Sequence, residues 1–375
     1  MDQIIEVPVK PGGFMESQSG IQRRRPKIFC RLVAKDDSRD TAFVLVHPTS
    51  NFHSHYLIEP LVARGNAVLA VNTRYVANDT MLTMERAIQD LGAAIRHLRG
   101  LGFRRVVLIG NSGGGSLAAM YQEQAERLTI RDTPDGLPID LEPGDLPPAD
   151  ALALVCAHPG RAEQLLTKID PAVLDERYPD LRDKSLDMYD PSIRPPFGQE
   201  WVARYRAAQH ARLRRITDWV LARIRQLEAT QPPEVADEPF IIHRTQADPR
   251  LLDLTLDAND RKQGSIQGQA ILANLAANGL ARFCTLRSFL SQWSPFHTRA
   301  NGPRCLANTS VPVLVVNHTA DQTVFPSHID QWMRAAGPRG VRHDLVGAPH
   351  YLDDRPELMN SLCDLLVGWS RDIRV

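Results

Sequence analysis

The stretch from Arg105 to Gly115 constrains the fold of this chain more than any other part of the sequence. It reads RVVLIGNSGGG, so an apolar run leads directly into a turn of small residues around Ser112. The residues that follow, from 117 to 128, have the pattern of a helix. A strand, a G-x-S-x-G turn and a helix in this order place the serine on a tight turn with its hydroxyl exposed. The stretch therefore predicts a nucleophilic serine between a strand and a helix.

Each residue type in this turn has a steric reason. The turn crowds its backbone against the neighbouring strand and helix, so we expect no room for a side chain at Gly110 or Gly114. We expect Ser112 to adopt a strained backbone conformation, and the N–H of Gly113 to point to the place where an oxyanion forms. The alternative is a glycine-rich turn whose serine has no chemical role.

The composition is that of a globular protein and excludes some classes of partner. The chain has 375 residues, of which 43% are hydrophobic and 23% charged, so it is long enough for a core domain with a sizeable insertion. Lys and Arg total 44, as do Asp and Glu, and the net charge is zero. This balance argues against a nucleic-acid binder or a protein of anionic membrane surfaces, which needs an excess of basic residues.

The cysteines and the start of the chain predict a cytoplasmic protein. The five cysteines lie far apart and form no C-x-x-C pair, so we expect neither a disulfide framework nor a zinc knot. The first residues show no basic region followed by a long apolar core, and we expect no signal peptide and no membrane span. A periplasmic protein that has lost its leader is the alternative.

Strand-like apolar runs alternate with helical patterns in two blocks of the chain. This alternation predicts an α/β fold with a mostly parallel sheet covered by helices on both faces. Two strand-like runs at the start, 4–9 and 27–34, suggest an antiparallel edge. We predict that residues 1–158 and 306–375 form this core.

The middle of the chain, residues 159–305, differs from the two blocks. It is rich in proline, arginine and helical patterns, and the apolar residues of 200–229 recur at nearly helical spacing. We predict a helical insertion between two halves of one sheet. The arginines of 200–229 either attract an anionic substrate or form a solvated helix face, and the balanced charge of the chain favours the second interpretation.

A serine hydroxyl needs a base within hydrogen-bond reach and an acid that orients the base. With the nucleophile after a central strand, the expected chain order is serine, acid, histidine. Asp321 follows the strand-like run 313–316, and His350 follows the run 342–346. The loops at the carboxyl ends of parallel strands meet in one crevice. We therefore predict that Ser112, Asp321 and His350 form a catalytic triad.

Other residues near the same strand ends fit these roles less well. His343 lies within a strand and is expected to be structural, and His318 belongs to a strand end where a polar structural role is about equally expected. Alternative acids are Asp344, Asp353 and Asp354. We rank Asp321 first because its loop, TADQTVFP, fits an acid-bearing turn.

These three residues, their positions at strand ends and the insertion before the acid strand resemble the α/β-hydrolase superfamily. The resemblance covers about residues 27–157 and 306–372. It implies that the insertion is a cap or lid, and that the activity is that of an esterase, lipase, lactonase, amidase or related hydrolase. It also implies a second oxyanion donor in the loop after the third strand, often in a His-Gly-x context.

That loop reads His47-Pro48-Thr49-Ser50 in this chain and departs from the usual context. Pro48 has no N–H to donate, so the expected second donor beside Gly113 is Thr49, with Ser50 behind it. Candidate pocket residues are His47, Ser50 and His158, although capping or packing is the more common role for a histidine such as His158.

The predicted reaction is the cleavage of a carboxylic ester through an acyl-enzyme, with a small-molecule acyl substrate and no cofactor. His350 takes the serine proton, Asp321 holds the imidazole, and water then hydrolyses the acyl group. An amidase, a lactonase or a carbon–carbon bond hydrolase would use the same triad. The run Gly113–Gly115 has no following lysine and does not fit G-x-G-x-x-G, so no phosphate-binding loop is predicted.

Two hypotheses belong to other classes. His53 and His55 stand one residue apart and would suit a metal-dependent hydrolase, but no H-E-x-x-H is present and Ser112 would be left unexplained. A hydrolase fold kept as a binding module is the other hypothesis, since a fold does not determine a function. Such a module has no physical need to retain a serine, an acid and a histidine in this order.

Overall fold

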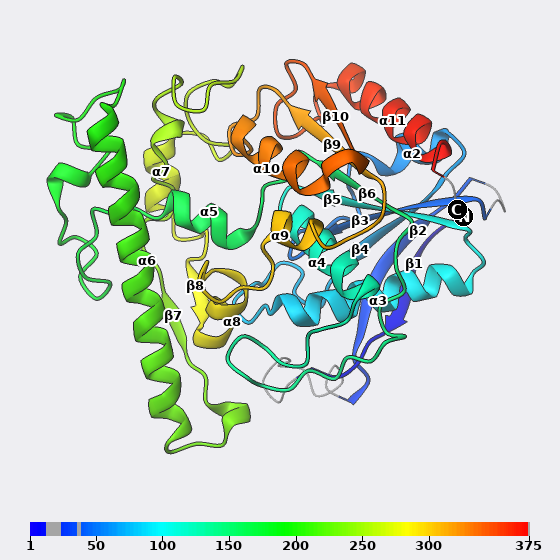
Figure 1. Cartoon of the computed structure of the whole chain (residues 1–375), viewed down its shortest axis with the longest axis horizontal. Coiled ribbons are helices and arrows are strands. Elements are labelled where there is room, and N and C mark those ends of the chain that lie inside the picture. Colours follow the sequence, from blue (N-terminus) through cyan, green and yellow to red (C-terminus); the bar gives the residue numbers. More distant parts are fainter. Residues whose placement is uncertain (13–23, 36–38, 374–375) are drawn as a thin grey trace.

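A computed structural model describes residues 1–12, 24–35 and 39–373, and its centre is an eight-stranded sheet (Figure 1). The strand order is β1-β2-β4-β3-β5-β6-β9-β10. The pairs β1–β2 and β2–β4 are antiparallel and the remaining pairs are parallel, which confirms the predicted parallel sheet with an antiparallel edge. The strands are β1 (Asp2–Pro8), β2 (Lys27–Val33), β3 (Thr41–His47), β4 (Ala67–Asn72), β5 (Arg105–Asn111), β6 (Ala151–Val155), β9 (Val313–His318) and β10 (Gly340–Leu345).

Helices cover both faces of the sheet, so its central strands are buried on both sides. On β3, Val44 and Val46 join one apolar cluster, whereas Phe43 and Leu45 join another. Because successive side chains of a strand point to opposite faces, this division marks the two layers of the core. The first layer is formed by α3 (Met84–Gly100), α4 (Gly114–Glu126), α9 (Gly302–Leu306) and α10 (Pro326–Ala336), and the second by α2 (Ile58–Ala63) and α11 (Pro356–Arg371).

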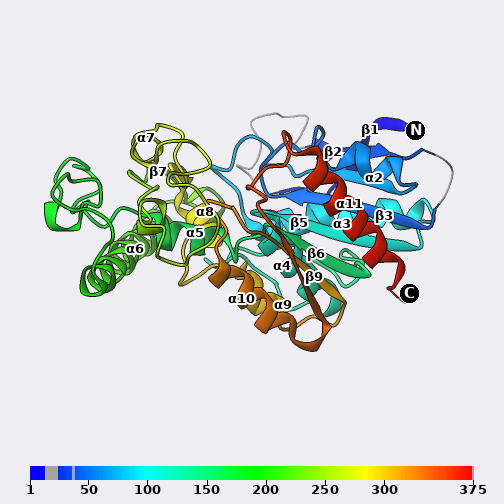
Figure 2. The ribbon, with the colours of Figure 1, turned by 90° about the horizontal axis from the view of Figure 1, so that it is seen from above.

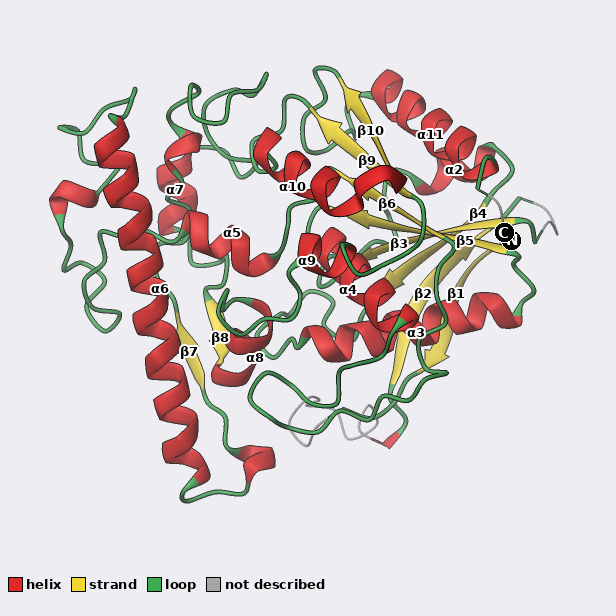
Figure 3. Ribbon diagram, viewed as in Figure 1, coloured by secondary structure: helices red, strands yellow, loops and turns green. Residues whose placement is uncertain are grey.

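A helical insertion lies to one side of this core, at the left of Figures 1 and 2. The arrowheads of the parallel strands point toward it, so it stands at the carboxyl ends of these strands (Figure 3). Its elements are α5 (Arg161–Lys168), α6 (Gln199–Glu228), β7 (Pro239–Ile241), α7 (Ala270–Leu275), β8 (Phe283–Thr285) and α8 (Leu286–Gln292). The antiparallel pair β7–β8 was not predicted, because strands of three residues are too short for a periodic pattern.

Helix α6, with 30 residues, is the longest helix of the insertion, and its range agrees with the predicted helical range 200–229 to within one residue. An apolar stripe along this helix, which includes Leu213, Val220 and Ile224, packs against Phe289 and Trp293 in a cluster separate from the two core layers. Among the described residues, no helix combines the length and the apolar composition that crossing a bilayer requires.

The interpretation of the α6 arginines as a solvated face is wrong for Arg212. This side chain is fully buried, and its guanidinium donates to both carboxylate oxygens of Glu176 at 2.8 and 2.6 Å. It also donates to the backbone carbonyls of Asp170 and His243. A guanidinium carries five donors, so one buried arginine can satisfy three neighbouring segments of the insertion. Arg212 therefore holds the insertion together from within.

The turn between β5 and α4 packs directly on the neighbouring strands. A Cβ atom at Gly114 would lie 2.0 Å from the carbonyl oxygen of Val46 in β3. A Cβ atom at Gly110 would lie 2.7 Å from the Cα atom of Gly115. These distances are too short for any side chain, which confirms the predicted steric reason for both glycines.

We predict that Gly114→Ala lowers the free energy of unfolding by about 2 kcal/mol or more, because the added methyl group meets backbone that cannot move aside. Gly100→Ala is the matched control, since a Cβ atom there meets nothing within 4 Å. The control should stay within about 0.5 kcal/mol of the wild type or exceed it, because alanine favours a helix. Urea unfolding of the three proteins measures the difference, and equal stabilities of the two variants would contradict the packing argument.

Candidate active site

Ser112 stands at the turn after β5 with a backbone φ of +53°. This left-handed conformation is uncommon for a residue with a side chain, and it is the strain that the sequence predicts. The turn is fixed on both sides of the serine: its N–H donates to the carbonyl of Val155 at 3.1 Å, and its carbonyl accepts from Gly115 at 3.2 Å. The hydroxyl oxygen lies 3.1 Å from Nε2 of His350.

The chain of hydrogen bonds continues from His350 to a buried carboxylate. Nδ1 of His350 lies 2.6 Å from Oδ2 of Asp321, and both side chains are buried. The other carboxylate oxygen accepts the backbone N–H groups of Thr323 and Val324 at 2.7 and 3.1 Å. The structure thus brings the three predicted residues together across β5, β9 and β10.

Asp321 remains ionised in this setting. Burial by itself would raise the pKa of the Asp321 carboxyl, but the attraction and hydrogen bond of His350 and the Thr323 amide outweigh it and hold the pKa below its usual value. A carboxylate that stays charged at neutral pH can fix the tautomer of His350 and stabilise its protonated form.

The alternative residues occupy other positions. His318 is buried, and its Nδ1–H donates to the carbonyl of Pro349 at 2.7 Å, so it supports the loop that carries His350. Burial lowers the pKa of His318 to about 4. His343, expected to be structural, is exposed because β10 is an edge strand. Asp344 pairs with Arg342 on the same strand at 2.9 Å.

The turn that bears Asp321 is held by side-chain and backbone groups of the insertion. The amide of Asn259 donates to the Asp321 carbonyl at 2.9 Å, and the N–H of Asp260 donates to the Thr319 carbonyl at 2.8 Å. From α5, the ammonium of Lys168 donates to the Thr323 hydroxyl at 2.6 Å. Sequence reasoning missed these contacts because no motif links the two segments.

Cys156 is a second residue that sequence reasoning missed. It follows β6 with a φ of +37°, and its thiol lies 3.6 Å from the carbonyl oxygen of His350. Its sulfur, a carboxylate oxygen of Asp321 and a ring nitrogen of His350 lie within 4.8 Å of one another. Burial raises the pKa of the Cys156 thiol well above its usual value, so the sulfur is a neutral thiol at physiological pH. The thiol therefore lies beside the pair formed by His350 and Asp321.

The two histidines of the metal hypothesis are engaged elsewhere. Nε2 of His53 lies 3.1 Å from the carbonyl oxygen of Phe29. Nδ1 of His55 accepts the N–H of Leu57 at 3.2 Å, and its ring stacks on Tyr56. Within the ranges that the structure describes, neither histidine belongs to a group of three metal-type ligands. The geometry therefore does not support the hypothesis of a metal-dependent hydrolase.

The loop after β3 departs from the expected oxyanion site. The N–H groups of Thr49 and Ser50 both donate to Nδ1 of His47, at 3.1 and 2.9 Å. The expected second donor, Thr49, is thus directed at the imidazole, because the ring of His47 has turned toward its own loop. The N–H of Gly113 has no protein acceptor among the described residues.

Two imidazoles flank Gly113. A Cβ atom at this glycine would lie 2.7 Å from Nε2 of His47 and 3.4 Å from Nε2 of His158. His47 ends β3 and His158 follows β6, the two neighbours of β5, so the two rings reach Gly113 from the strands on either side of β5. Burial lowers the pKa of His47 to about 3 and that of His158 well below its usual value. Both rings are therefore neutral at physiological pH.

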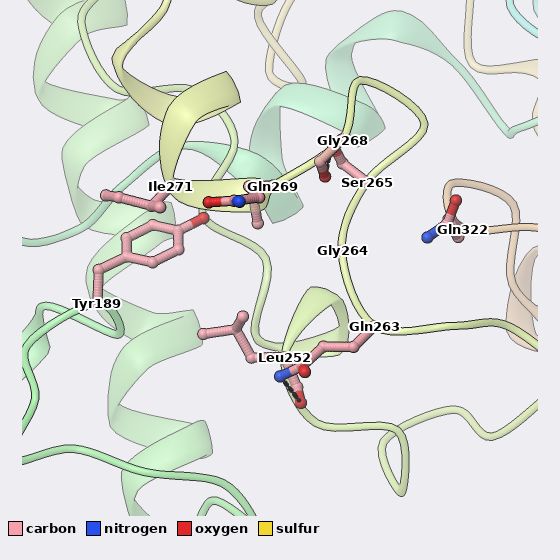
Figure 4. A pocket seen from close by; sticks show the side chains of 10 residues that line it. Tyr189, Leu252, Gln263, Gly264, Ser265, Gly268, Gln269, Ile271 and Gln322 are labelled. Carbon is pink, nitrogen blue, oxygen red and sulfur yellow. Dashed lines mark hydrogen bonds between the residues drawn. The ribbon is translucent and has the colours of Figure 1, made fainter.

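A cavity of about 430 Å³ lies beside the acid turn (Figure 4). Gln322, the residue after Asp321, lines it from the core, whereas Tyr189, Gln263 and Gln269 line it from the insertion. Ser112 is not part of its lining, so this cavity is distinct from the place where the hydroxyl points. It shows that the insertion and the acid turn share a boundary.

Comparison with known proteins identifies the family to which this fold belongs. A model of the alpha/beta hydrolase family matches residues 43–362. The chain therefore belongs to the alpha/beta hydrolase family, and it is a hydrolase enzyme. Comparison with curated proteins gives no match.

Several solved structures are similar to this chain at low sequence identity. A complex of DcsB with its substrate analogue is 14% identical over 100% of both chains, with a TM-score of 0.54. The esterase domain of a Rhodothermus marinus protein is 14% identical over 98% of each chain, with a TM-score of 0.48. A monoacylglycerol lipase of Paleococcus ferrophilus is 14% identical over 92% of this chain and 99% of its own, with a TM-score of 0.45. At 14% identity, the match to the DcsB complex, whose TM-score exceeds 0.5, indicates a shared fold only.

The buried histidines make stability depend on pH, and His328 at the start of α10 provides a test. Burial lowers the pKa of His328 to about 3. Below pH 6.5 this imidazole is therefore protonated in the unfolded chain but stays neutral in the folded chain. As the pH falls below 6.5, the free energy of unfolding decreases by about 1.4 kcal/mol for each pH unit because of this one group. We predict that from pH 7 to pH 5 the wild type loses about 2 kcal/mol more than His328→Phe. Urea unfolding at both pH values checks this, and parallel losses would contradict it.

Proposed function

We propose that this hydrolase cleaves carboxylic esters of small molecules through an acyl-enzyme formed on Ser112. The observation that carries the proposal is the continuous chain from the Ser112 hydroxyl through His350 to Asp321, at 3.1 and 2.6 Å. A nucleophile, a base and an orienting acid within hydrogen-bond reach are what acyl transfer to a serine requires. The free N–H of Gly113 beside the nucleophile supports the same reaction.

The reaction has two halves. Oγ of Ser112 attacks the ester carbonyl while His350 takes the hydroxyl proton, and the carbonyl oxygen becomes an oxyanion near the Gly113 N–H. When the intermediate collapses, the carbon–oxygen bond to the alcohol breaks and His350 returns the proton to the leaving alcohol. Water then attacks the acyl group with the same base, which releases the acid and restores the serine. Asp321 keeps its charge throughout and stabilises the imidazolium.

We further propose that residues 159–305 act as a cap over the site. Their position at the carboxyl ends of the parallel strands supports this role (Figure 3). Ala300, Cys305 and Leu306 pack in the first layer of the core rather than with the insertion. The part that covers the site would therefore end before residue 300.

We propose a cytoplasmic location for the enzyme. The five cysteines of the chain are all buried and unpaired, which fits a compartment that keeps thiols reduced.

The nucleophile can be tested by covalent labelling. We predict that a fluorophosphonate modifies Ser112, that Ser112→Ala is not modified, and that short-chain p-nitrophenyl esters are hydrolysed only by the wild type. Intact-mass spectrometry and peptide mapping locate the label. A label at another residue, or unchanged esterase activity in Ser112→Ala, would contradict the proposal. Turnover of an amide, a lactone or a β-diketone but no ester would favour an amidase, a lactonase or a carbon–carbon bond hydrolase.

The role of Asp321 can be tested by replacing one carboxylate oxygen with an amide nitrogen. We predict that Asp321→Asn lowers kcat by about 10⁴ with little change in KM, because the amide imposes the wrong tautomer on His350. Asp344→Asn, at an acid on the edge strand β10, is the matched control and should retain wild-type kcat. Steady-state ester hydrolysis measures both. A larger loss in the control than in Asp321→Asn would reassign the acid.

A further inference from the structure

We propose that the imidazole of His47, through its Nε2–H, is the second donor to the oxyanion and takes the place of the backbone N–H expected from the loop after β3. The inference rests on the proposed function of Ser112. It names a catalytic residue for the same site, and it assigns that part to a side chain instead of the main chain.

The first step is the loss of the expected donor. Pro48 has no N–H, and the N–H groups of Thr49 and Ser50 are both directed at Nδ1 of His47. The loop is braced in this form, because the Thr73 hydroxyl donates to the Pro48 carbonyl at 2.6 Å and the Ala77 N–H donates to the Thr49 carbonyl at 2.8 Å. A backbone donor from this loop would need a rearrangement that breaks these contacts.

The second step fixes the proton of the ring. A nitrogen that accepts two N–H groups must present its lone pair, so Nδ1 of His47 carries no proton. In a neutral imidazole the proton then resides on Nε2. Burial, together with the positive charge of Arg161 nearby, lowers the pKa of His47 to about 3, which keeps the ring neutral. His47 therefore offers one N–H donor, and its direction is set by the two backbone amides.

The third step is the position of this donor. Nε2 of His47 would lie 2.7 Å from a Cβ atom at Gly113, so the missing side chain of that glycine leaves the space into which the ring extends. The same glycine supplies the other oxyanion donor through its own N–H. Among the described residues, Nε2 has no protein acceptor, so its proton remains available to a substrate.

His158 does not qualify for this role on the same evidence. Its Nε2 lies farther from the Gly113 position, at 3.4 Å against 2.7 Å, and its Nδ1 is buried with no hydrogen-bond partner among the described residues. Nothing therefore determines which of its nitrogens carries the proton. His47 differs because two donors select its tautomer.

The chemical consequence concerns the transition state. An oxyanion that develops on the substrate carbonyl would receive one hydrogen bond from the Gly113 N–H and one from the His47 ring. A neutral imidazole donates without transferring a proton to the substrate, and neutral imidazoles stabilise oxyanions in other enzymes. Removing one such donor typically lowers turnover by about 100-fold to 1000-fold.

The direct test uses the wild-type enzyme labelled with ¹⁵N-histidine and a short-chain alkyl trifluoromethyl ketone. This probe adds to the serine and leaves an oxyanion at the carbonyl carbon. We expect the Nε2–H tautomer at His47 in the free enzyme and a downfield shift of that proton in the adduct. Signals are assigned by comparison with His47→Gln.

The outcomes separate the two proposals. If no adduct forms at Ser112, the proposed function fails. If the adduct forms while the His47 proton does not shift, or if that proton is on Nδ1, the inference about His47 is overturned and the proposed function stands.

Kinetics give an independent readout. We predict that His47→Phe, which keeps a ring but has no donor, lowers kcat for an aryl ester about 100-fold with KM within a few-fold. His47→Gln, whose amide can place an N–H near the position of Nε2, should recover kcat to within about tenfold of the wild type. A His47→Phe enzyme that is folded by circular dichroism and retains wild-type kcat would overturn the inference. If this variant does not fold, the spectroscopic test on the wild type still decides.

Discussion

The close contact between the start of α4 and the backbone of β3 determines the geometry of the site. With 2.0 Å between a Cβ atom at Gly114 and the Val46 carbonyl oxygen, helix and strand meet without any side chain between them. This contact leaves Ser112 in a left-handed conformation at the top of the turn, where its hydroxyl faces outward. The same contact brings the end of β3, and with it His47, beside Gly113. The proposed nucleophile and the proposed oxyanion site therefore both depend on this one packing constraint.

The electrostatics of the site follow from burial. Asp321 stays charged because His350 and backbone amides stabilise it, whereas burial keeps His47, His158 and His318 neutral. In the proposed mechanism, the charged carboxylate stabilises the imidazolium that forms when His350 takes the serine proton. Additional cationic histidines would oppose that step, so their neutrality serves the base as well as the fold.

Much of the fold could be predicted from the sequence, because long periodic segments and turn chemistry determine it. The pattern RVVLIGNSGGG specifies the strand, the turn and the helix, and both crowded glycines follow from sterics alone. The positions of Asp321 and His350 could be expected because parallel strands bring their carboxyl ends together. Short elements such as α5, α8 and β7 were missed because they span too few residues for a period to appear.

The details of the site depended on contacts that no sequence pattern records. Thr49 was expected to face the oxyanion, but the direction of its N–H is set by the orientation of the His47 ring. Asn259 supports the acid turn from 62 residues away, and Arg212 is buried because Glu176 and two carbonyls surround it. Such contacts depend on tertiary packing, which periodicity and spacing do not report.

The hydrogen bond from Asn259 to Asp321 has a consequence for how this enzyme can diverge. Two parts of the molecule contribute to the turn that carries Asp321. The sheet domain provides its backbone, and the insertion provides the hydrogen bonds that support it. A recombinant that exchanges the whole insertion for a foreign one would inherit a serine and a histidine in place but an acid without its anchor. We therefore expect substitutions on the outer surface of α6 to disturb the acid-bearing turn less than substitutions in the segment 257–260, which contacts that turn directly.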